Sequence, residues 1–138
     1  MSIRNLNHLF APKSIALIGA STNPYGVGGV VARNLKTGGF TGPIWLVNPK
    51  FGSDLDTNCF RSTNDLPSAP DLAIIATPPS TIPRTIKELA TKGTRATVVI
   101  TAGLGADLRK AMLDAARPSL MRIQGPNCLG LILPPIGL

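Results

Sequence analysis

Residues 14–29 read SIALIGASTNPYGVGG and decide the fold, because an apolar run gives way to a small-residue loop and then to a helical pattern that begins at Val27. This order is typical of a strand, a tight turn and a helix. It places the first N–H groups of the helix, which lack partners within the helix, at the carboxyl end of a buried strand. The helix dipole also favours negative charge there. The stretch therefore predicts a phosphate site, with Gly26 and Gly28 near the end of the loop.

The glycine spacing leaves the identity of the ligand open. It is not G-x-G-x-x-G, and the loop is longer than the usual dinucleotide-binding turn. A strand–turn–helix unit that binds no ligand has the same pattern. The loop alone predicts a phosphate-binding site but does not identify the ligand that carries the phosphate.

The rest of the chain alternates between apolar runs and amphipathic segments. Strands are predicted over residues 14–18, 44–48, 59–60, 72–76, 96–101 and 120–123, and helices over residues 27–37, 80–93 and 107–117, after a short amphipathic opening over residues 1–13. Continuously apolar strands that alternate with helices are typical of a parallel sheet with right-handed crossovers. We therefore predict an α/β, Rossmann-like, doubly wound fold, with a mainly parallel sheet and helices on both faces.

The predicted organisation is a single domain over residues 1–138, an N-terminal fragment of a longer multidomain protein, because residues 133–138 have no stop signal. On the helix predicted over residues 80–93, Glu88 and Lys92 have the i,i+4 spacing of an ion pair. The turns after the strands carry Gly, Pro, Ser and Asn. Such turns gather at the carboxyl edge of the sheet, where doubly wound folds bind ligands.

Composition narrows the class of partner. The chain has 14 Lys and Arg against 7 Asp and Glu, a net charge of +7, which favours an anionic partner. Its basic residues are scattered and its aromatic residues are few, so we expect a phosphorylated small molecule and no nucleic acid. The apolar runs are too short to span a bilayer. Without a secretory segment, Cys59 and Cys128 are expected to be reduced thiols of a cytoplasmic protein.

Neither a catalytic group nor a metal site is predicted. The cysteines lack metal-binding spacing, and His8 is the single histidine. It has no carboxylate or cysteine near it in sequence, which favours a surface or capping role.

The end of the second predicted strand indicates the kind of nucleotide. In nicotinamide-binding sheets an Asp or Glu there accepts the ribose hydroxyls. This chain has Asn48, Pro49 and Lys50 instead. A lysine favours an additional phosphate, which NADP and coenzyme A both carry on the ribose. A solvated lysine with no ligand is the third alternative.

Several motifs, taken in order along nearly the whole chain, resemble those of a known family. It is the amino-terminal CoA-binding domain of the NDP-forming acyl-CoA synthetases, which are related to the succinyl-CoA synthetase alpha subunit and include fusions to lysine acetyltransferase domains. The motifs are PKSIALIGAS (12–21), GFTGP (39–43), VNP (47–49), DLAIIATP (71–78), VITAG (99–103) and GPNCLG (125–130).

The resemblance implies that coenzyme A or acyl-CoA is the ligand, and it implies a role for each loop. The first loop would hold the CoA phosphates, the second its nucleotide, the third the adenine or upper pantetheine, and the last two the thiol end. By this resemblance the binding residues are Gly19, Ala20, Ser21, Gly26, Val27 and Gly28; Asn48, Pro49 and Lys50; Thr77, Pro78 and Pro79; Thr101, Ala102 and Gly103; and Asn127. Thr101 and Asn127 equally fit a role limited to closing turns.

One departure bears on activity. Full enzymes of the family carry phosphate on a histidine from a following domain, and no residue here matches it. ATP-grasp and acetyltransferase segments are also missing from this sequence. The resemblance therefore implies a CoA-binding domain that works with downstream CoA-ligase, ATP-grasp or acetyltransferase domains of the same protein. The alternatives are a regulatory CoA-binding domain of an acetyltransferase fusion and an NADP-binding oxidoreductase domain.

Overall fold

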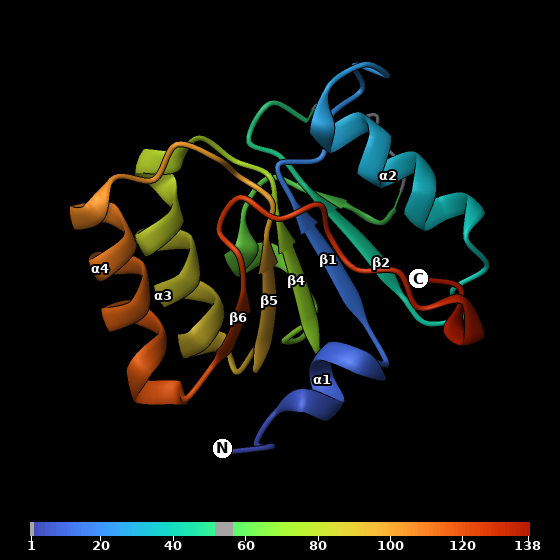
Figure 1. Ribbon diagram of the computed structural model, residues 1–138. Helices are drawn as coiled ribbons and strands as arrows, with labels where there is room; N and C mark the ends of the chain where they lie inside the picture. The colour runs from blue at the N-terminus through green and yellow to red at the C-terminus, as the bar shows by residue number, and fades with distance from the viewer. Residues whose placement is uncertain (1, 52–56) are drawn as a thin grey trace.

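A computed structural model describes residues 2–51 and 57–138, and the strands in these residues form one parallel sheet (Figure 1). The sheet has six strands in the order β3-β2-β1-β4-β5-β6, and every neighbouring pair is parallel. Its strands are β1 (Ile15–Ile18), β2 (Ile44–Val47), β3 (Cys59–Phe60), β4 (Leu72–Ile75), β5 (Ala96–Val99) and β6 (Arg122–Gln124). The order reverses between β1 and β4, which confirms the predicted doubly wound fold.

The central strands are buried along their whole length. All residues of β1, β4 and β5 are buried, as expected for parallel strands covered on both sides. Because successive side chains point to opposite faces, Ala16 and Ile18 belong to one apolar cluster, whereas Ile15 and Leu17 belong to the other. The continuous apolar run is therefore the sequence signature of two cores divided by the sheet.

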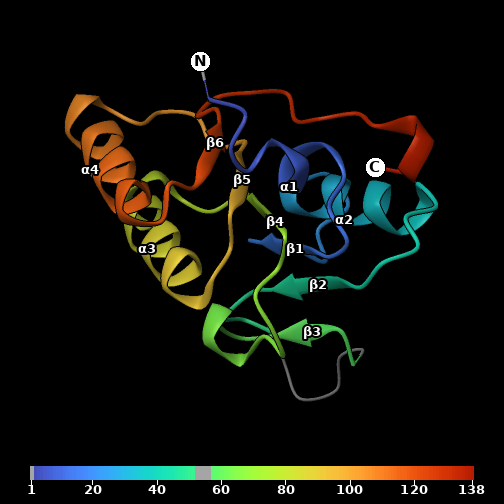
Figure 2. The ribbon, with the colours of Figure 1, turned by 90° about the horizontal axis from the view of Figure 1, so that it is seen from below.

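Helices cover both faces of the sheet, as predicted (Figures 1 and 2). The helices are α1 (Leu6–Phe10), α2 (Val27–Thr37), α3 (Ile82–Lys92) and α4 (Ala106–Ala116). On one side α1 and α2 contribute Leu9 and Leu35 to the core. On the other side α3 and α4 contribute Ile82, Ile86 and Met112. The amphipathic segments therefore each bury one face against the sheet.

The last strand begins later than predicted. The 3-10 turn η3 (Arg117–Ser119) follows α4, and Leu120 then adopts a left-handed conformation with φ 53°. The strand β6 consequently starts at Arg122 rather than at residue 120. Pro118 prevents α4 from continuing, and the chain needs the extra residues to turn into the sheet.

Beyond β6, the C-terminal segment crosses the face of the sheet that α1 and α2 cover (Figures 1 and 2). Leu131 and Leu138 pack against the core on this face, and a last 3-10 turn, η4, spans Pro134–Ile136. Within the described residues, no helix is long and apolar enough to cross a membrane.

Candidate functional site

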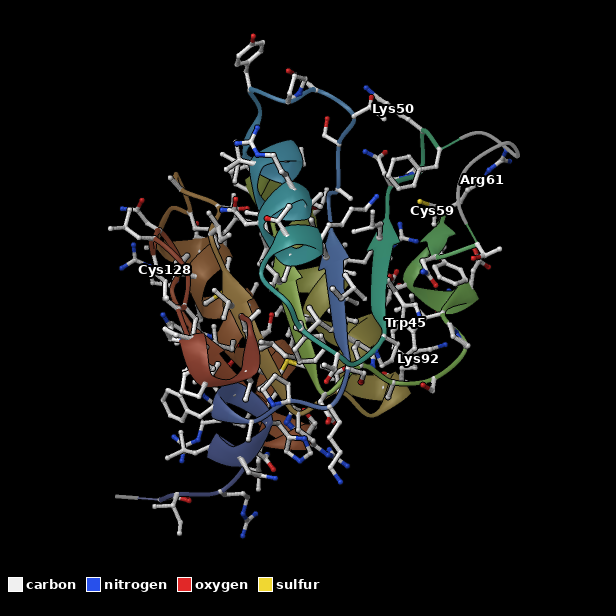
Figure 3. The ribbon with its side chains drawn as sticks, turned by 90° about the vertical axis from the view of Figure 1, so that its right-hand side faces the viewer. Trp45, Lys50, Cys59, Arg61, Lys92 and Cys128 are labelled. Carbon is white, nitrogen blue, oxygen red and sulfur yellow. The ribbon has the colours of Figure 1, made fainter. Side chains whose placement is uncertain are left out.

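The predicted binding residues follow the carboxyl ends of β1, β2, β4, β5 and β6, and two of them, Val27 and Gly28, lie in the first turn of α2. Parallel strands bring these ends to one edge of the sheet. Figure 3 shows Lys50 and Arg61 beyond the arrowheads of the strands, and Trp45 and Lys92 toward the opposite edge. The fold therefore gathers all the predicted loops at one edge.

Close packing between the loop after β1 and α2 requires glycine. Gly19 has φ +94°, and a Cβ there would overlap the Ala76 carbonyl. A Cβ on Gly28 would overlap the Gly19 carbonyl oxygen and lie 3.3 Å from the backbone nitrogen of Ser21. The first turn of α2 thus lies directly against the start of the loop.

Not every backbone N–H of this loop is available to a ligand. The Gly19 and Ala20 N–H groups both donate to the Val47 carbonyl, at 2.9 and 3.2 Å. Gly26 is the N-cap of α2, and no side chain caps this helix. Among the described residues, the N–H groups of Ser21, Thr22, Val27 and Gly28 have no hydrogen-bond partner. These N–H groups are the ones that could meet a phosphate.

Asn48 connects the loop after β1 to the loop after β2. Its Nδ2 donates to the Ala20 carbonyl at 2.6 Å, and its Oδ1 accepts from the Lys50 N–H at 2.9 Å. Pro49 and Lys50 are exposed. The Asn48 side chain therefore holds the two loops together and leaves the Lys50 ammonium at the surface of the site.

A cleft of about 590 Å³ opens between the ends of β1 and β2 on one side and β4 with α3 on the other. Its apolar and small residues include Ile18, Gly19, Val47, Pro49, Thr77 and Pro78. Its charged residues are Arg61, Arg84 and Glu88. The cleft is wide enough for a substantial organic group and contains more cations than carboxylates.

Hydrogen bonds join the loops after β4, β5 and β6. The Thr101 hydroxyl donates to the Thr77 carbonyl at 2.7 Å, and the Asn127 N–H donates to the Thr101 carbonyl at 3.0 Å. Asn127 has φ 56° and is exposed, as are Ala102 and Gly103. A Cβ on Gly103 would come within 3.8 Å of Pro79, so these predicted residues lie close together.

The charged groups of the cleft include a carboxylate that the sequence analysis paired wrongly. Glu88 Oε1 accepts from Arg84 Nε at 2.8 Å, and Oε2 accepts from the Thr63 hydroxyl at 2.7 Å. Lys92, the predicted partner, donates instead to the Asn64 carbonyl at 3.0 Å. Burial raises the pKa of Glu88, but the hydrogen bonds from Thr63 and Arg84 outweigh it and hold this pKa below its ordinary value.

Neither His8 nor Cys128 lines the cleft. His8 Nδ1 lies 3.2 Å from Asp71 Oδ1, just before β4 begins and thus at the opposite edge of the sheet. The Cys128 thiol donates to the Val99 carbonyl at 3.4 Å. Residues 2–51 and 57–138 hold no group of three or more His, Cys, Asp and Glu that could bind a metal. The two arginines of the cleft and the free N–H groups of the loop after β1 suit an anionic ligand.

Comparison with known proteins identifies the family. The chain matches the family described as "CoA binding domain" over residues 13–134. It belongs to the CoA-binding domain family. Coenzyme A is therefore the ligand class of this domain, in agreement with the motif resemblance, and the NADP alternative is not favoured.

The relatives of this CoA-binding domain are larger proteins. It is 37% identical over 137 residues to acetate–CoA ligase [ADP-forming] II of Archaeoglobus fulgidus. The aligned region covers 95% of this chain and 20% of the ligase. It is 32% identical over 145 residues to the alpha subunit of acetate–CoA ligase [ADP-forming] I of Pyrococcus furiosus, with 97% and 31% covered. The chain thus spans about a fifth to a third of the length of these relatives.

A solved structure agrees with the fold. The acetyl-coenzyme A synthetase 1 of Ca. Korarchaeum cryptofilum, described as dinucleotide forming and in complex with phosphate and ADP, superposes with a TM-score of 0.89 at 32% identity. The match covers 96% of this chain and 30% of the synthetase chain. The CoA-binding domain is therefore homologous to a portion of an ADP-forming acyl-CoA synthetase.

Proposed function

We propose that this domain binds coenzyme A across the carboxyl edge of its sheet, as one part of an ADP-forming acyl-CoA synthetase. The observation that carries the proposal is the set of unpartnered N–H groups of Ser21, Thr22, Val27 and Gly28. Gly28 packs against Gly19, which lines the cleft that contains Arg61 and Arg84. The CoA diphosphate would lie at these N–H groups. Backbone donors at a helix N-terminus suit a diphosphate because each donates to an oxygen without adding a mobile side chain.

The two halves of the ligand would then extend in opposite directions from the diphosphate. The adenosine 3′-phosphate would enter the cleft between β2 and α3, beside Pro49 and Thr77. Lys50 is the exposed residue that follows Pro49, and its ammonium would meet the phosphate from there. The pantetheine would run toward the joined loops at Thr101 and Asn127. This placement brings the thiol to the β5 and β6 end of the edge, where a neighbouring domain could reach it.

The whole protein would interconvert acyl-CoA, ADP and phosphate with acid, CoA and ATP. The relatives named acetate–CoA ligase [ADP-forming] favour this role over a regulatory domain of an acetyltransferase fusion. Downstream CoA-ligase and ATP-grasp domains would supply the phosphate-carrying histidine and the nucleotide site, and this domain would orient the thiol. Because the reaction uses CoA and ATP, the protein would work in the cytoplasm.

Calorimetric titration tests the proposal. The domain is titrated with CoA, acetyl-CoA, 3′-dephospho-CoA, NAD and NADP, and CoA is titrated again into Lys50→Ala and Lys87→Ala. Lys87 is exposed on α3 and does not line the cleft, so it controls for the loss of one positive charge. We expect saturable CoA binding that Lys50→Ala weakens and Lys87→Ala does not. NADP binding without CoA binding would refute the proposal.

A further inference from the structure

Arg84 contributes a cation to the cleft from the first half of α3. Its side chain is 86% exposed, and Nε donates to Glu88 Oε1 at 2.8 Å. A guanidinium has five N–H donors, so this bond leaves four on the terminal nitrogens. Among the described residues these four N–H groups have no partner. Arg84 therefore combines a fixed inner nitrogen with donors that remain free to meet an anion.

Glu88 determines where the Arg84 guanidinium lies. The Glu88 side chain is 26% exposed, and the buried Thr63 hydroxyl holds its other oxygen at 2.7 Å. Thr63 belongs to the 3-10 turn η1 (Thr63–Asp65), which packs against α3. The carboxylate is thus anchored from the β3 side of the cleft and keeps the guanidinium on the α3 wall. Anchoring reduces the rotamer freedom that a long side chain loses on binding.

A second guanidinium, that of Arg61, lines the same cleft. Arg61 Nε donates to the Phe51 carbonyl at 2.9 Å, which holds Arg61 to the residue that follows Lys50. Both arginines line the same cleft, one before η1 and the other on α3. The cleft's negative charge comes from Glu88, which is already paired with Arg84. The net charge of the cleft is positive, and its donors have the fork geometry that matches a phosphate.

We infer that Arg84 is a specificity-determining residue that recognises the ribose phosphate of the ligand, with Glu88 as its positioning residue. This inference rests on the proposed function and extends it, because Lys50 was the residue that the sequence indicated for an additional phosphate and Arg84 was not among the predicted binding residues. A guanidinium binds a phosphate through two parallel N–H···O bonds, whereas a lysine contributes a point charge. Arg84 would thus distinguish ligands with a ribose phosphate from those without one, while Lys50 adds charge from its position after Pro49.

The test compares ligands that differ only in that phosphate. CoA and 3′-dephospho-CoA are titrated into the wild-type domain, Arg84→Gln and the control Lys87→Gln, which removes the same charge from the same helix. We expect Arg84→Gln to raise the Kd of CoA about fivefold to tenfold, the range of an exposed but bidentate ion pair, and to leave the Kd of 3′-dephospho-CoA within about twofold. Lys87→Gln should leave both constants within about twofold.

The double variant Arg84→Gln/Glu88→Gln separates recognition from repulsion. In Arg84→Gln alone, the unpaired Glu88 carboxylate could repel the phosphate. If the Arg84 guanidinium binds the phosphate, the double variant still binds CoA several-fold more weakly than wild type. The inference would be overturned if the double variant distinguished CoA from 3′-dephospho-CoA as well as wild type does. It would also be overturned if Arg84→Gln weakened the binding of both ligands equally.

Failure of the inference and failure of the proposed function give different results. If the wild-type domain binds neither CoA nor 3′-dephospho-CoA, the proposed function fails and the inference fails with it. If it binds both and Arg84→Gln changes neither constant, only the Arg84 assignment is wrong. Tighter binding of NADP than of CoA would assign the arginine to a 2′-phosphate and contradict a CoA site.

Discussion

Gly28 lies so close to the Gly19 carbonyl that the loss of stability caused by a side chain at this position can be estimated. In Gly28→Ala the new Cβ would overlap a backbone oxygen that cannot rotate away, so the loop or the helix must shift. Overpacking costs about 1–3 kcal/mol, and a backbone obstacle places this case near the upper end. Alanine's better helix propensity returns about 1 kcal/mol. We therefore expect Gly28→Ala to lower the free energy of unfolding by about 2 kcal/mol.

Urea denaturation followed by circular dichroism measures this change. With an m-value of about 2 kcal/mol per molar, the midpoint should fall by about 1 M while m stays constant. Gly26→Ala is the matched control in the same loop, because a Cβ there would lie 3.6 Å from its nearest neighbour, an ordinary contact. We expect Gly26→Ala to change stability by less than about 1 kcal/mol. Equal effects of the two substitutions, or a fully stable Gly28→Ala, would refute the steric argument.

Three further predictions concern polar groups. Asn48→Asp replaces the donor to the Ala20 carbonyl with a carboxylate oxygen. Denaturant titrations should show that the free energy of unfolding falls by about 2 kcal/mol at neutral pH and by less in acid, where the carboxylate is protonated. A loss that does not depend on pH would contradict this explanation. Thr97→Val removes the buried hydroxyl that donates to the Ala73 carbonyl at 2.9 Å, and thermal unfolding should show a loss of about 1 kcal/mol. Because the folded-state pKa of Glu88 is lowered, its contribution to stability is present above its ordinary pKa of 4.5 and disappears as pH falls through the folded value. Glu88→Gln should therefore lose less stability than wild type on acidification below that pH.

Local signals in the sequence suffice for most of the fold. The helix predicted over residues 27–37 has the bounds of α2, because Gly26 begins it and a pair of glycines follows it. The buried strands follow from their continuous apolar runs. The predicted start of β6 was wrong by two residues. Leu120 adopts a left-handed conformation where the strand was expected, and a leucine gives no signal for that conformation.

The candidate site could be predicted only in part. Topology places Lys50 at the ligand edge once the strands are known. The sequence cannot choose between Arg84 and Lys92 as the partner of Glu88, because both are spaced i,i+4 on the same helix. Packing against η1 decides it, since the Asn64 carbonyl there binds Lys92. Residues that meet only through tertiary packing, such as those of the cleft, leave no pattern in a single sequence.

The hydrogen bonds of Asn48 affect when the backbone around the site loses its conformational entropy. Ordering the backbone of one loop residue costs about 1–2 kcal/mol, and a free loop would meet that cost when the ligand arrives. The Asn48 side chain donates to the Ala20 carbonyl and accepts from the Lys50 N–H, so residue 20 and residues 48–50 are held together once the chain has folded. A ligand that touches residue 20 and residues 48–50 then encounters a preorganised surface, so less of its interaction energy is consumed by ordering the protein.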